Sequence, residues 1–390
     1  MNPTTSTRSY YPALDGLRGI AILLVICCHN FDFLPYFEFG RVGVDLFFVL
    51  SGFLITDILL KTREKKNFLR NFYLRRVLKI FPVYYGALLL FFIIAPIFQN
   101  AHVQFDYYQR NQPFLWLHLQ NWLEFIHIQP EDSMVLNHFW SLSVEAQFYL
   151  IWPLMVLVVT NTRLLSQILI MVVVICVLAR FSSWSHFGAG SANFYFQHIT
   201  RLDGICIGSL IAIWRLSSYD QTKKRVLRLG LITLTLQIIL FVVSKTLVTF
   251  PHFAFTGYTF IAASFGIIVF FAAEKRNFLS IIVLENAVIR FIGRISYGLF
   301  VFHWPILAMF KIYLLKNLAD SGFSYQSGYL AISLLALATT VFISLISYYF
   351  FEKKILALKD LMTQDDFFAR VWKKLLLFFY RTSARKPGSQ

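Results

Sequence analysis

Long hydrophobic runs separated by short polar stretches dominate the pattern of this chain. An α-helix needs about 17–25 predominantly apolar residues to cross a bilayer. Among the candidate runs, the one at 200–215 is the weakest, because Arg201 and Asp203 interrupt its start. The pattern predicts an all-α integral membrane protein with about ten transmembrane helices. The ten runs lie at 14–30, 44–60, 80–98, 144–160, 165–181, 200–215, 229–245, 254–273, 295–316 and 329–351.

Basic residues are distributed unevenly among the gaps between these runs. The alternate gaps 31–43, 99–141, 183–200, 246–253 and 317–328 contain only Arg41 and Arg110, whereas 26 Lys and Arg residues lie in the other gaps and the tail. Cytoplasmic loops of membrane proteins carry such an excess. The alternation therefore predicts ten spans with both termini in the cytoplasm. The basic segments are 61–79, 215–228, 274–294 and 352–390.

The composition excludes a disordered chain, a disulfide scaffold and an ordinary soluble domain. Hydrophobic residues make up 57% of the chain and charged residues only 14%, whereas soluble domains carry about 25% charged residues. The net charge of +16 would suggest nucleic acid as the partner of a soluble protein. Here the basic residues lie between apolar runs, so topology explains the charge and no nucleic-acid partner is expected. The four cysteines lie in apolar runs, which is typical of small buried hydrophobic residues.

Two units are expected along the chain. Residues 1–352 form a ten-span membrane domain, and residues 353–390 form a basic cytoplasmic tail. Within the tail, Thr363 is a candidate helix cap, and apolar residues recur with lysines over 367–379. This pattern predicts an amphipathic helix in the membrane interface. Packing of that helix against the bundle is the alternative.

Ionisable residues inside apolar runs are costly and usually face the bundle interior or a wet cavity. Arg18 and His29 are eleven residues apart on the first run. Eleven residues turn an α-helix through about 1100° and rise about 16 Å, so both side chains point the same way. Such a face suits a long substrate with an anionic end. The alternative is that Arg18 reaches lipid headgroups and His29 caps the helix.

Two carboxylates are candidates to act with His29. Asp45 opens the second run and is expected near His29, where it would fix the tautomer of the imidazole; an acidic residue placed by the helix dipole is the alternative. Glu145 lies one turn beyond Ser141 and Ser143, either of which is expected to cap its helix. A Glu–His pair is a usual general-base arrangement, so Glu145 is predicted to pair with His29.

His303 lies two residues before Pro305, which loosens its helix. It is either a second site residue or a buried histidine bonded to a freed carbonyl; the sequence slightly favours the second. The roles of Arg201 and Asp203 stay open. No metal site is expected, because the histidines of the outer loop show no close spacing and no HExxH motif occurs. These histidines are His102, His118, His127 and His138.

Arg75, Arg76 and Lys79 precede the third run. Their spacing lets the three cations converge on one side of a helix. Convergent Arg and Lys side chains suit a phosphorylated ligand. Contact with lipid headgroups is the alternative.

Five blocks in order resemble the membrane acyltransferase-3 family, and the resemblance covers about residues 11–352. They include the Arg-x10-His signature formed by Arg18 and His29. The blocks are Tyr11-Pro-Ala-Leu-Asp15-Gly-Leu-Arg18, Gly43-Val-Asp45-Leu-Phe-Phe-Val-Leu-Ser51-Gly52-Phe53, Arg75-Arg76, Asn137-His-Phe-Trp140-Ser-Leu-Ser-Val-Glu145-Ala-Gln-Phe-Tyr149, and Ser296-Tyr297 with His303-Trp-Pro305.

This resemblance implies an integral-membrane O-acyltransferase of a bacterial inner membrane. Its donor would be cytoplasmic acyl-CoA, with acetyl the commonest acyl group, and no cofactor would be held permanently. The acceptor would be a hydroxyl of a cell-surface or lipid-linked glycan. The chain is expected to lack the fused hydrolase-like domain of some relatives. It departs from the family pattern at Lys79, Ala146 and Lys353-Lys354, where Arg, an acidic residue and Pro are usual.

The residues and the resemblance together predict one mechanism. CoA phosphates would bind the cations, and His29 would deprotonate the acceptor hydroxyl. Direct transfer and an acyl-histidine intermediate both remain open. A transporter of an acidic or glycan solute along the same polar path is the alternative, and a scaffold role is a weaker one. The predicted catalytic residues are His29, Glu145 and Asp45, and the predicted donor-binding residues are Arg18, Arg75, Arg76 and Lys79.

Overall fold

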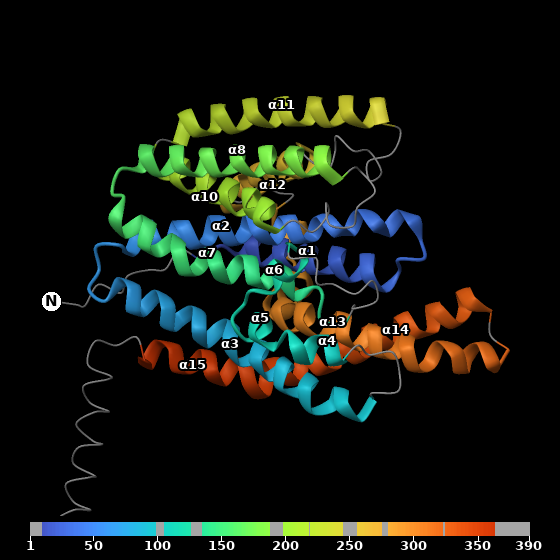
Figure 1. Ribbon diagram of the computed structural model, residues 1–390. Helices are drawn as coiled ribbons and strands as arrows, with labels where there is room; N and C mark the ends of the chain where they lie inside the picture. Colours follow the sequence, from blue (N-terminus) through green and yellow to red (C-terminus); the bar gives the residue numbers. More distant parts are fainter. Residues whose placement is uncertain are drawn as a thin grey trace, which may run out of the picture.

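The computed structural model describes residues 10–98, 105–125, 135–187, 198–217, 219–244, 256–274, 280–322 and 324–362 (Figure 1). Within these ranges all regular elements are helical and no strand occurs. The α-helices are α1 (Pro12–Asn30), α2 (Val42–Thr62), α3 (Phe68–Ile94), α4 (Phe105–Arg110), α5 (Gln112–Trp116), α6 (Gln120–Phe125), α7 (Phe139–Val158), α8 (Thr162–Phe187), α10 (Leu202–Ser217), α11 (Tyr219–Ser244), α12 (Tyr258–Ala273), α13 (Ala287–Asp320), α14 (Tyr325–Ile346) and α15 (Lys353–Met362).

Shorter helical segments link these helices. The 3-10 turns are η1 (Pro35–Arg41), η2 (Ala95–Phe98) and η3 (His198–Arg201), and the π-helical turns are η5 (Ser280–Leu284) and η6 (Ser347–Glu352). The segment 363–390, which includes the predicted interfacial helix, lies outside the described residues.

Seven helical segments of the described chain are long and apolar enough to cross a membrane. They contain α1, α2, α3, α7, α8, α13 and α14, so seven of the ten predicted spans meet this criterion. The predicted runs at 200–215, 229–245 and 254–273 form α10, α11 and α12; α10 and α12 have 16 residues each. The protein is therefore a multi-pass membrane protein.

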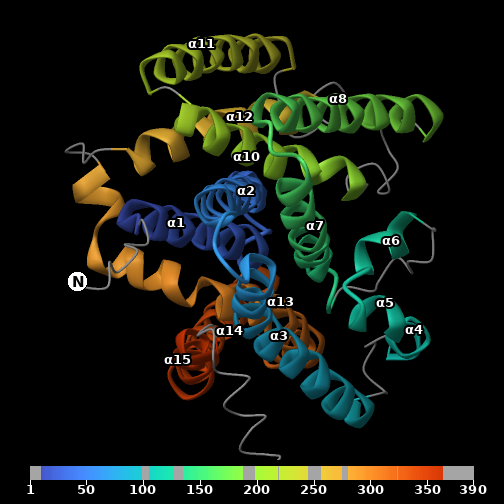
Figure 2. The same cartoon turned by 90° about the vertical axis from the view of Figure 1, so that its left-hand side faces the viewer.

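Helices α1 and α2 lie side by side at the centre of the bundle (Figure 2). On one side α1 packs against α13, which pairs with α14. On the other side α2 packs against α10, which contacts α8 and α12. The short helices α4, α5 and α6 lie beyond α7 in this view. The arrangement surrounds α1 and α2, which carry Arg18, His29 and Asp45, with other helices.

Glycines let the central helices approach their partners closely. A Cβ at Gly19 would collide with the Ile289 carbonyl oxygen of α13, and a Cβ at Gly293 would collide with the Asp15 carbonyl oxygen of α1. On α10, a Cβ at Gly208 would collide with a backbone oxygen of α2. Lipid tails are as apolar as leucine, so membrane helices associate through such close packing of small residues. These contacts fix α1 and α2 against both halves of the bundle.

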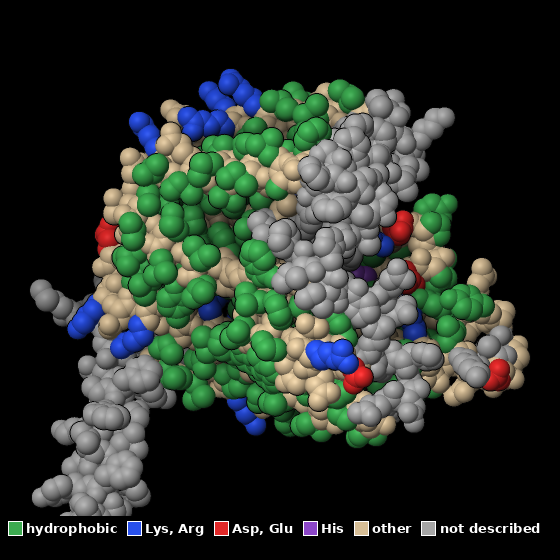
Figure 3. Space-filling model, viewed as in Figure 1, with side chains coloured by type: hydrophobic (Ala, Val, Ile, Leu, Met, Phe, Trp, Pro, Cys, Tyr) green, Lys and Arg blue, Asp and Glu red, His purple; other side chains and the backbone are tan. Residues whose placement is uncertain are grey.

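The outer surface of the bundle is apolar. Exposed side chains of α7 and α8 include Leu150, Val158, Met171 and Leu178. Figure 3 shows hydrophobic side chains across this flank, with many of the Lys and Arg side chains gathered toward the end at which the N-terminus and α15 lie. An apolar flank with charged ends is the surface that a bilayer requires.

Candidate active site

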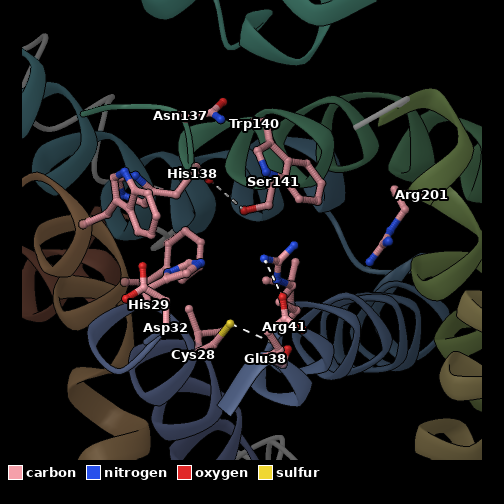
Figure 4. Close-up of a pocket in the computed structure, with 14 residues that line it drawn as sticks. Cys28, His29, Asp32, Glu38, Arg41, Asn137, His138, Trp140, Ser141 and Arg201 are labelled. Carbon is pink, nitrogen blue, oxygen red and sulfur yellow. Dashed lines mark hydrogen bonds and ion pairs between the residues drawn. The ribbon is translucent and has the colours of Figure 1, made fainter. Parts of the chain in front are cut away.

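A cavity of about 320 Å³ lies between α1, α2, α7 and α13 (Figure 4), and we call it the large cavity. Its volume falls in the lower part of the range of about 300–1,000 Å³ that is usual for small-molecule sites. Side chains of both charge signs and two tryptophans line it. The lining includes His29, Arg41, His138, Trp140, Arg201 and Trp304.

His29 is paired with His303, and the pairing fixes its tautomer. Nδ1 of His303 lies 2.7 Å from the Phe300 carbonyl oxygen, so this nitrogen carries the proton that the carbonyl accepts. In a neutral ring the Nε2 atom of His303 is then an acceptor, and it lies 2.8 Å from Nδ1 of His29. Nδ1 of His29 is therefore the donor in this bond. Its Nε2 keeps a lone pair, which is the state that a general base needs.

The surroundings hold the two rings in place. The ring of Trp304 meets the ring of His29 edge to face, with centroids 4.2 Å apart. Pro305 has no N–H to donate to the Val301 carbonyl one turn earlier. Nε2 of His138 lies 3.2 Å from that carbonyl oxygen and takes the place of the missing donor. Burial, with the neighbouring His303, holds the pKa of His138 well below its usual range, so this ring is neutral.

The predicted contact between Asp45 and His29 is wrong. Oδ1 of Asp45 lies 2.7 Å from the Arg201 guanidinium, and both side chains are almost fully buried. A second buried pair lies nearby, with Arg180 2.7 Å from Asp203. Arg201 competes successfully for Asp45 because a buried carboxylate gains more from a cation than from a neutral imidazole. Together these pairs join α2, η3, α8 and α10.

The predicted pair of Glu145 with His29 is also wrong. Glu145 accepts a hydrogen bond of 2.6 Å from the Ser51 hydroxyl and one of 3.2 Å from the Tyr149 hydroxyl. Neither Ser141 nor Ser143 caps α7; the first donates to the His138 carbonyl and the second to the Phe139 carbonyl. Glu145 instead lines a separate cavity, away from His29.

That cavity is small and basic, with a volume of about 40 Å³. Arg18, Arg76 and Lys79 line it together with Glu145, and we call it the basic cavity. The spacing of Arg76 and Lys79 predicted that they would converge, and they do. Arg75 is not part of this lining.

A third cavity, also of about 40 Å³, lies between the other two, and we call it the middle cavity. It shares Arg18 and Glu145 with the basic cavity and Ser141 and Phe300 with the large cavity. Arg18 and His29 therefore line one row of cavities, as their spacing on α1 predicts. The middle and basic cavities are both small, so only the His29 end of the row has the volume of a small-molecule site.

Three site residues lie outside the predicted catalytic set. His303 was a candidate, but its bond to His29 depends on the packing of α1 against α13, which no local pattern reveals. The spacing pattern marks His138 only as one of four loop histidines, although its place at the start of the fourth motif block is a usable signal. The sequence marks Arg41 only as an exception to the charge distribution.

Comparison with known proteins identifies the family. Residues 11–349 match the acyltransferase domain of the acyltransferase-3 family. The chain is 32% identical over 330 residues to the peptidoglycan O-acetyltransferase OatA of Listeria monocytogenes, covering 78% of this chain and 51% of that protein. It is 30% identical over 324 residues to the putative peptidoglycan O-acetyltransferase YrhL of Bacillus subtilis, covering 78% and 50%. The O-acetyltransferase OatA of Staphylococcus aureus is 28% identical over 330 residues, covering 79% and 52%.

The chain spans about half the length of these curated relatives. No solved structure matches it. The match covers α1 to η6 and includes both ends of the row of cavities. The chain belongs to the acyltransferase-3 family of multi-pass membrane proteins.

Proposed function

We propose that the protein is an O-acyltransferase that moves an acetyl group from acetyl-CoA to a hydroxyl of a bacterial cell-surface glycan. The observation that carries the proposal is His29, whose Nδ1 is bonded to His303 and whose Nε2 is left as an acceptor beside a cavity large enough for a sugar. The relatives named as peptidoglycan O-acetyltransferases support a glycan acceptor.

The proposed topology has ten crossings, with both termini and the basic cavity on the cytoplasmic side of the inner membrane. The alternation of basic gaps supports this orientation. The three helices that fail the length or hydropathy criterion, α10, α11 and α12, pack in the same bundle as the seven that meet it. In this orientation the large cavity faces the side of the membrane opposite the cytoplasm. A cell-surface glycan acceptor lies on that side.

Donor binding is proposed at the basic cavity. Arg18, Arg76 and Lys79 would hold the CoA phosphates, and Glu145 would balance their charge while no donor is bound. Arg18 and His29 are about 16 Å apart along α1. The pantetheine arm is comparable to about five residues of extended chain, roughly 17 Å. An arm anchored at Arg18 therefore has the length to present its thioester to His29, once the middle cavity widens to admit it.

The reaction proposed is direct transfer. Nε2 of His29 takes the proton of the acceptor hydroxyl, and the hydroxyl oxygen attacks the thioester carbonyl carbon. The positive charge that forms on His29 is shared through its bond to His303. The C–S bond breaks, and the CoA thiolate leaves with the proton from His29. The products are an acetyl ester and CoA.

The test is release of CoA from acetyl-CoA by the purified protein in nanodiscs, with and without a glycan acceptor. We expect His29→Gln to abolish release and Arg76→Ala to raise the KM for acetyl-CoA. Arg75→Ala is the matched control, because it removes the same charge one residue away but outside the basic cavity; its effect on KM should be smaller.

A transporter would leave acetyl-CoA intact. Wild-type protein that neither binds nor consumes acetyl-CoA would therefore refute the enzyme and favour transport of a solute along the row of cavities. Release that persists at the wild-type rate in His29→Gln would refute the role of His29 while keeping the enzyme. Formation of a labelled acetyl-histidine without acceptor would replace direct transfer by a two-step route.

A further inference from the structure

The large and middle cavities share part of their linings, and the shared side chains form the wall between them. Among the residues that the structure describes, Val44 of α2, Ser141 of α7 and Phe300 of α13 line both cavities. We call these three side chains the neck. Any group that travels from Arg18 in the middle cavity to His29 in the large cavity has to pass the neck.

The ring of Phe300 lies between a residue of each cavity. Its centroid is 6.2 Å from that of Phe47, which lines the middle cavity, and 5.5 Å from that of His138, which lines the large cavity. The backbone carbonyl of Phe300 accepts the bond from His303. The ring can therefore turn about its side-chain bonds without disturbing the bond between His303 and His29. Phe300 thus supplies the movable part of the neck.

The other two members of the neck are short side chains with little freedom. Val44 is β-branched, so one χ1 rotamer is strongly preferred on its helix. The Ser141 hydroxyl donates to the His138 carbonyl at 3.1 Å, which holds it against the start of its own helix. By contrast, the wall between the basic and middle cavities includes Arg18 and Glu145, whose long side chains have several rotatable bonds. The neck is therefore the stiffer of the two walls.

We propose that the neck selects the acyl donor by its width and that Phe300 is the residue that sets this width. The proposal rests on the acyltransferase function proposed above and adds the shape of the acyl group that reaches His29. A straight acyl chain is no wider than the part of the pantetheine arm that follows it, so a neck that opens for the arm admits the chain. A group that is branched next to the thioester is wider than the arm and is stopped. Acetyl, with its single methyl group, passes.

Two acyl donors made of the same atoms separate width from size. n-Butyryl-CoA and isobutyryl-CoA are isomers, and the second carries its branch next to the thioester carbonyl. Both are offered, beside acetyl-CoA, to the purified protein in nanodiscs, with solubilised peptidoglycan strands as acceptor and CoA release as the readout. We expect wild type to use the straight isomer about 10- to 200-fold better in kcat/KM, the range of discrimination that one methylene gives in an apolar pocket.

Phe300→Leu should reduce this ratio by about tenfold, because leucine leaves the neck apolar but wider. The readout is a ratio of two donors, so a loss of folded protein, which lowers both rates equally, does not change it. Phe302→Leu is the matched control. It makes the same substitution two residues away, at a partly buried ring that lines none of the three cavities, and should keep the wild-type ratio.

Val44→Phe tests the neck from the opposite direction, because it narrows the passage. It should lower kcat for acetyl-CoA by about tenfold or more, the effect of forcing a larger side chain into a packed site. Binding of CoA itself, measured by calorimetry, should stay close to that of wild type, because Val44 does not line the basic cavity.

Equal use of the two isomers by wild type would overturn the proposal. Rejection of both isomers alongside use of acetyl-CoA would do the same, because that result is selection by length. So would a Phe300→Leu protein that keeps the wild-type ratio, or a Val44→Phe protein that turns over acetyl-CoA like wild type. Failure of the proposed function is a different result, in which wild type releases no CoA from acetyl-CoA. His29-dependent release from acetyl-CoA with an unchanged ratio in Phe300→Leu would refute this inference alone.

Discussion

Replacing His303 tests whether the tautomer of His29 matters, and two amide substitutions separate its two hydrogen bonds. The amide of asparagine occupies the place of Nδ1, so His303→Asn keeps the bond to the Phe300 carbonyl but loses the acceptor for His29. The amide of glutamine reaches the place of Nε2, so His303→Gln restores that acceptor. Each variant therefore keeps one of the two bonds: His303→Asn keeps the bond to the Phe300 carbonyl, and His303→Gln keeps the acceptor that lies 2.8 Å from His29.

The expected loss follows from the bonds that change. General-base catalysis contributes about 10²–10⁴ in rate. Without the hydrogen-bond acceptor on His303, the proton of His29 can move to Nε2. The ring then presents a hydrogen-bond donor to the hydroxyl that receives the acyl group. We expect kcat to fall by about 100-fold in His303→Asn, equivalent to about 2.7 kcal/mol. The lost hydrogen bond lowers the free energy of unfolding by only about 1 kcal/mol, so the protein should remain folded.

The assay is steady-state CoA release with acceptor present, measured as kcat and KM for acetyl-CoA. His303→Gln should recover kcat to within about tenfold of wild type, and neither variant should change the KM, because His303 does not line the basic cavity. Equal kcat values for the two variants would show that the bond to His29 has no catalytic role. A change confined to the KM would refute the reasoning as well.

Three further predictions concern packing, buried charge and pH. Gly293→Ala should lower the melting temperature in detergent because its Cβ would collide with α1, whereas Gly86→Ala, which has open space, should leave it unchanged or raise it. Asp45→Asn should lower the free energy of unfolding by about 3–5 kcal/mol because it leaves buried Arg201 without its counter-charge, and pairing it with Arg201→Met should restore most of that loss. Burial lowers the pKa of His118 in the loop before α6 to about 4. The imidazole of His118 therefore binds a proton in the unfolded chain at pH values where it stays neutral in the folded protein. Stability should therefore fall as pH drops from about 6.5 toward 4, by up to about 3 kcal/mol. Unfolding of His118→Asn, compared with wild type across this range, should show a weaker dependence on pH; an identical dependence would contradict the assignment.

Several site features could be predicted from local spacing. Arg18 and His29 share a face because helical geometry fixes the angle between residues eleven apart. Arg76 and Lys79 converge for the same reason, and both line the basic cavity. The placement of Arg76 and Lys79 at one end of the row and of His29 at the other also follows from their positions along the runs. Their catalytic and binding roles remain predictions.

The pairing of side chains between helices could not be predicted in this way. Glu145 and Asp45 lie at positions along their helices that suit contact with His29. However, Glu145 bonds to Ser51 and Tyr149, and Asp45 bonds to Arg201. Depth in the membrane is readable from the sequence, but the rotation of each helix against its neighbours is not. A rotation of a few tens of degrees decides whether a carboxylate meets an imidazole or a guanidinium.

The sequence by itself determined the membrane class, most of the spans, the family and the face of α1 that carries Arg18 and His29, because hydropathy and helical periodicity are local properties. Only the tertiary structure decided that His303 is the partner of His29 and that Arg41 and Glu38 face the same cavity. Those choices depend on the close approach of α1 to α13 and to η1, which Gly19, Gly293 and Gly40 permit. The bond between His29 and His303 joins residues 274 apart in the sequence, and such contacts are set by packing, which is a property of the whole bundle.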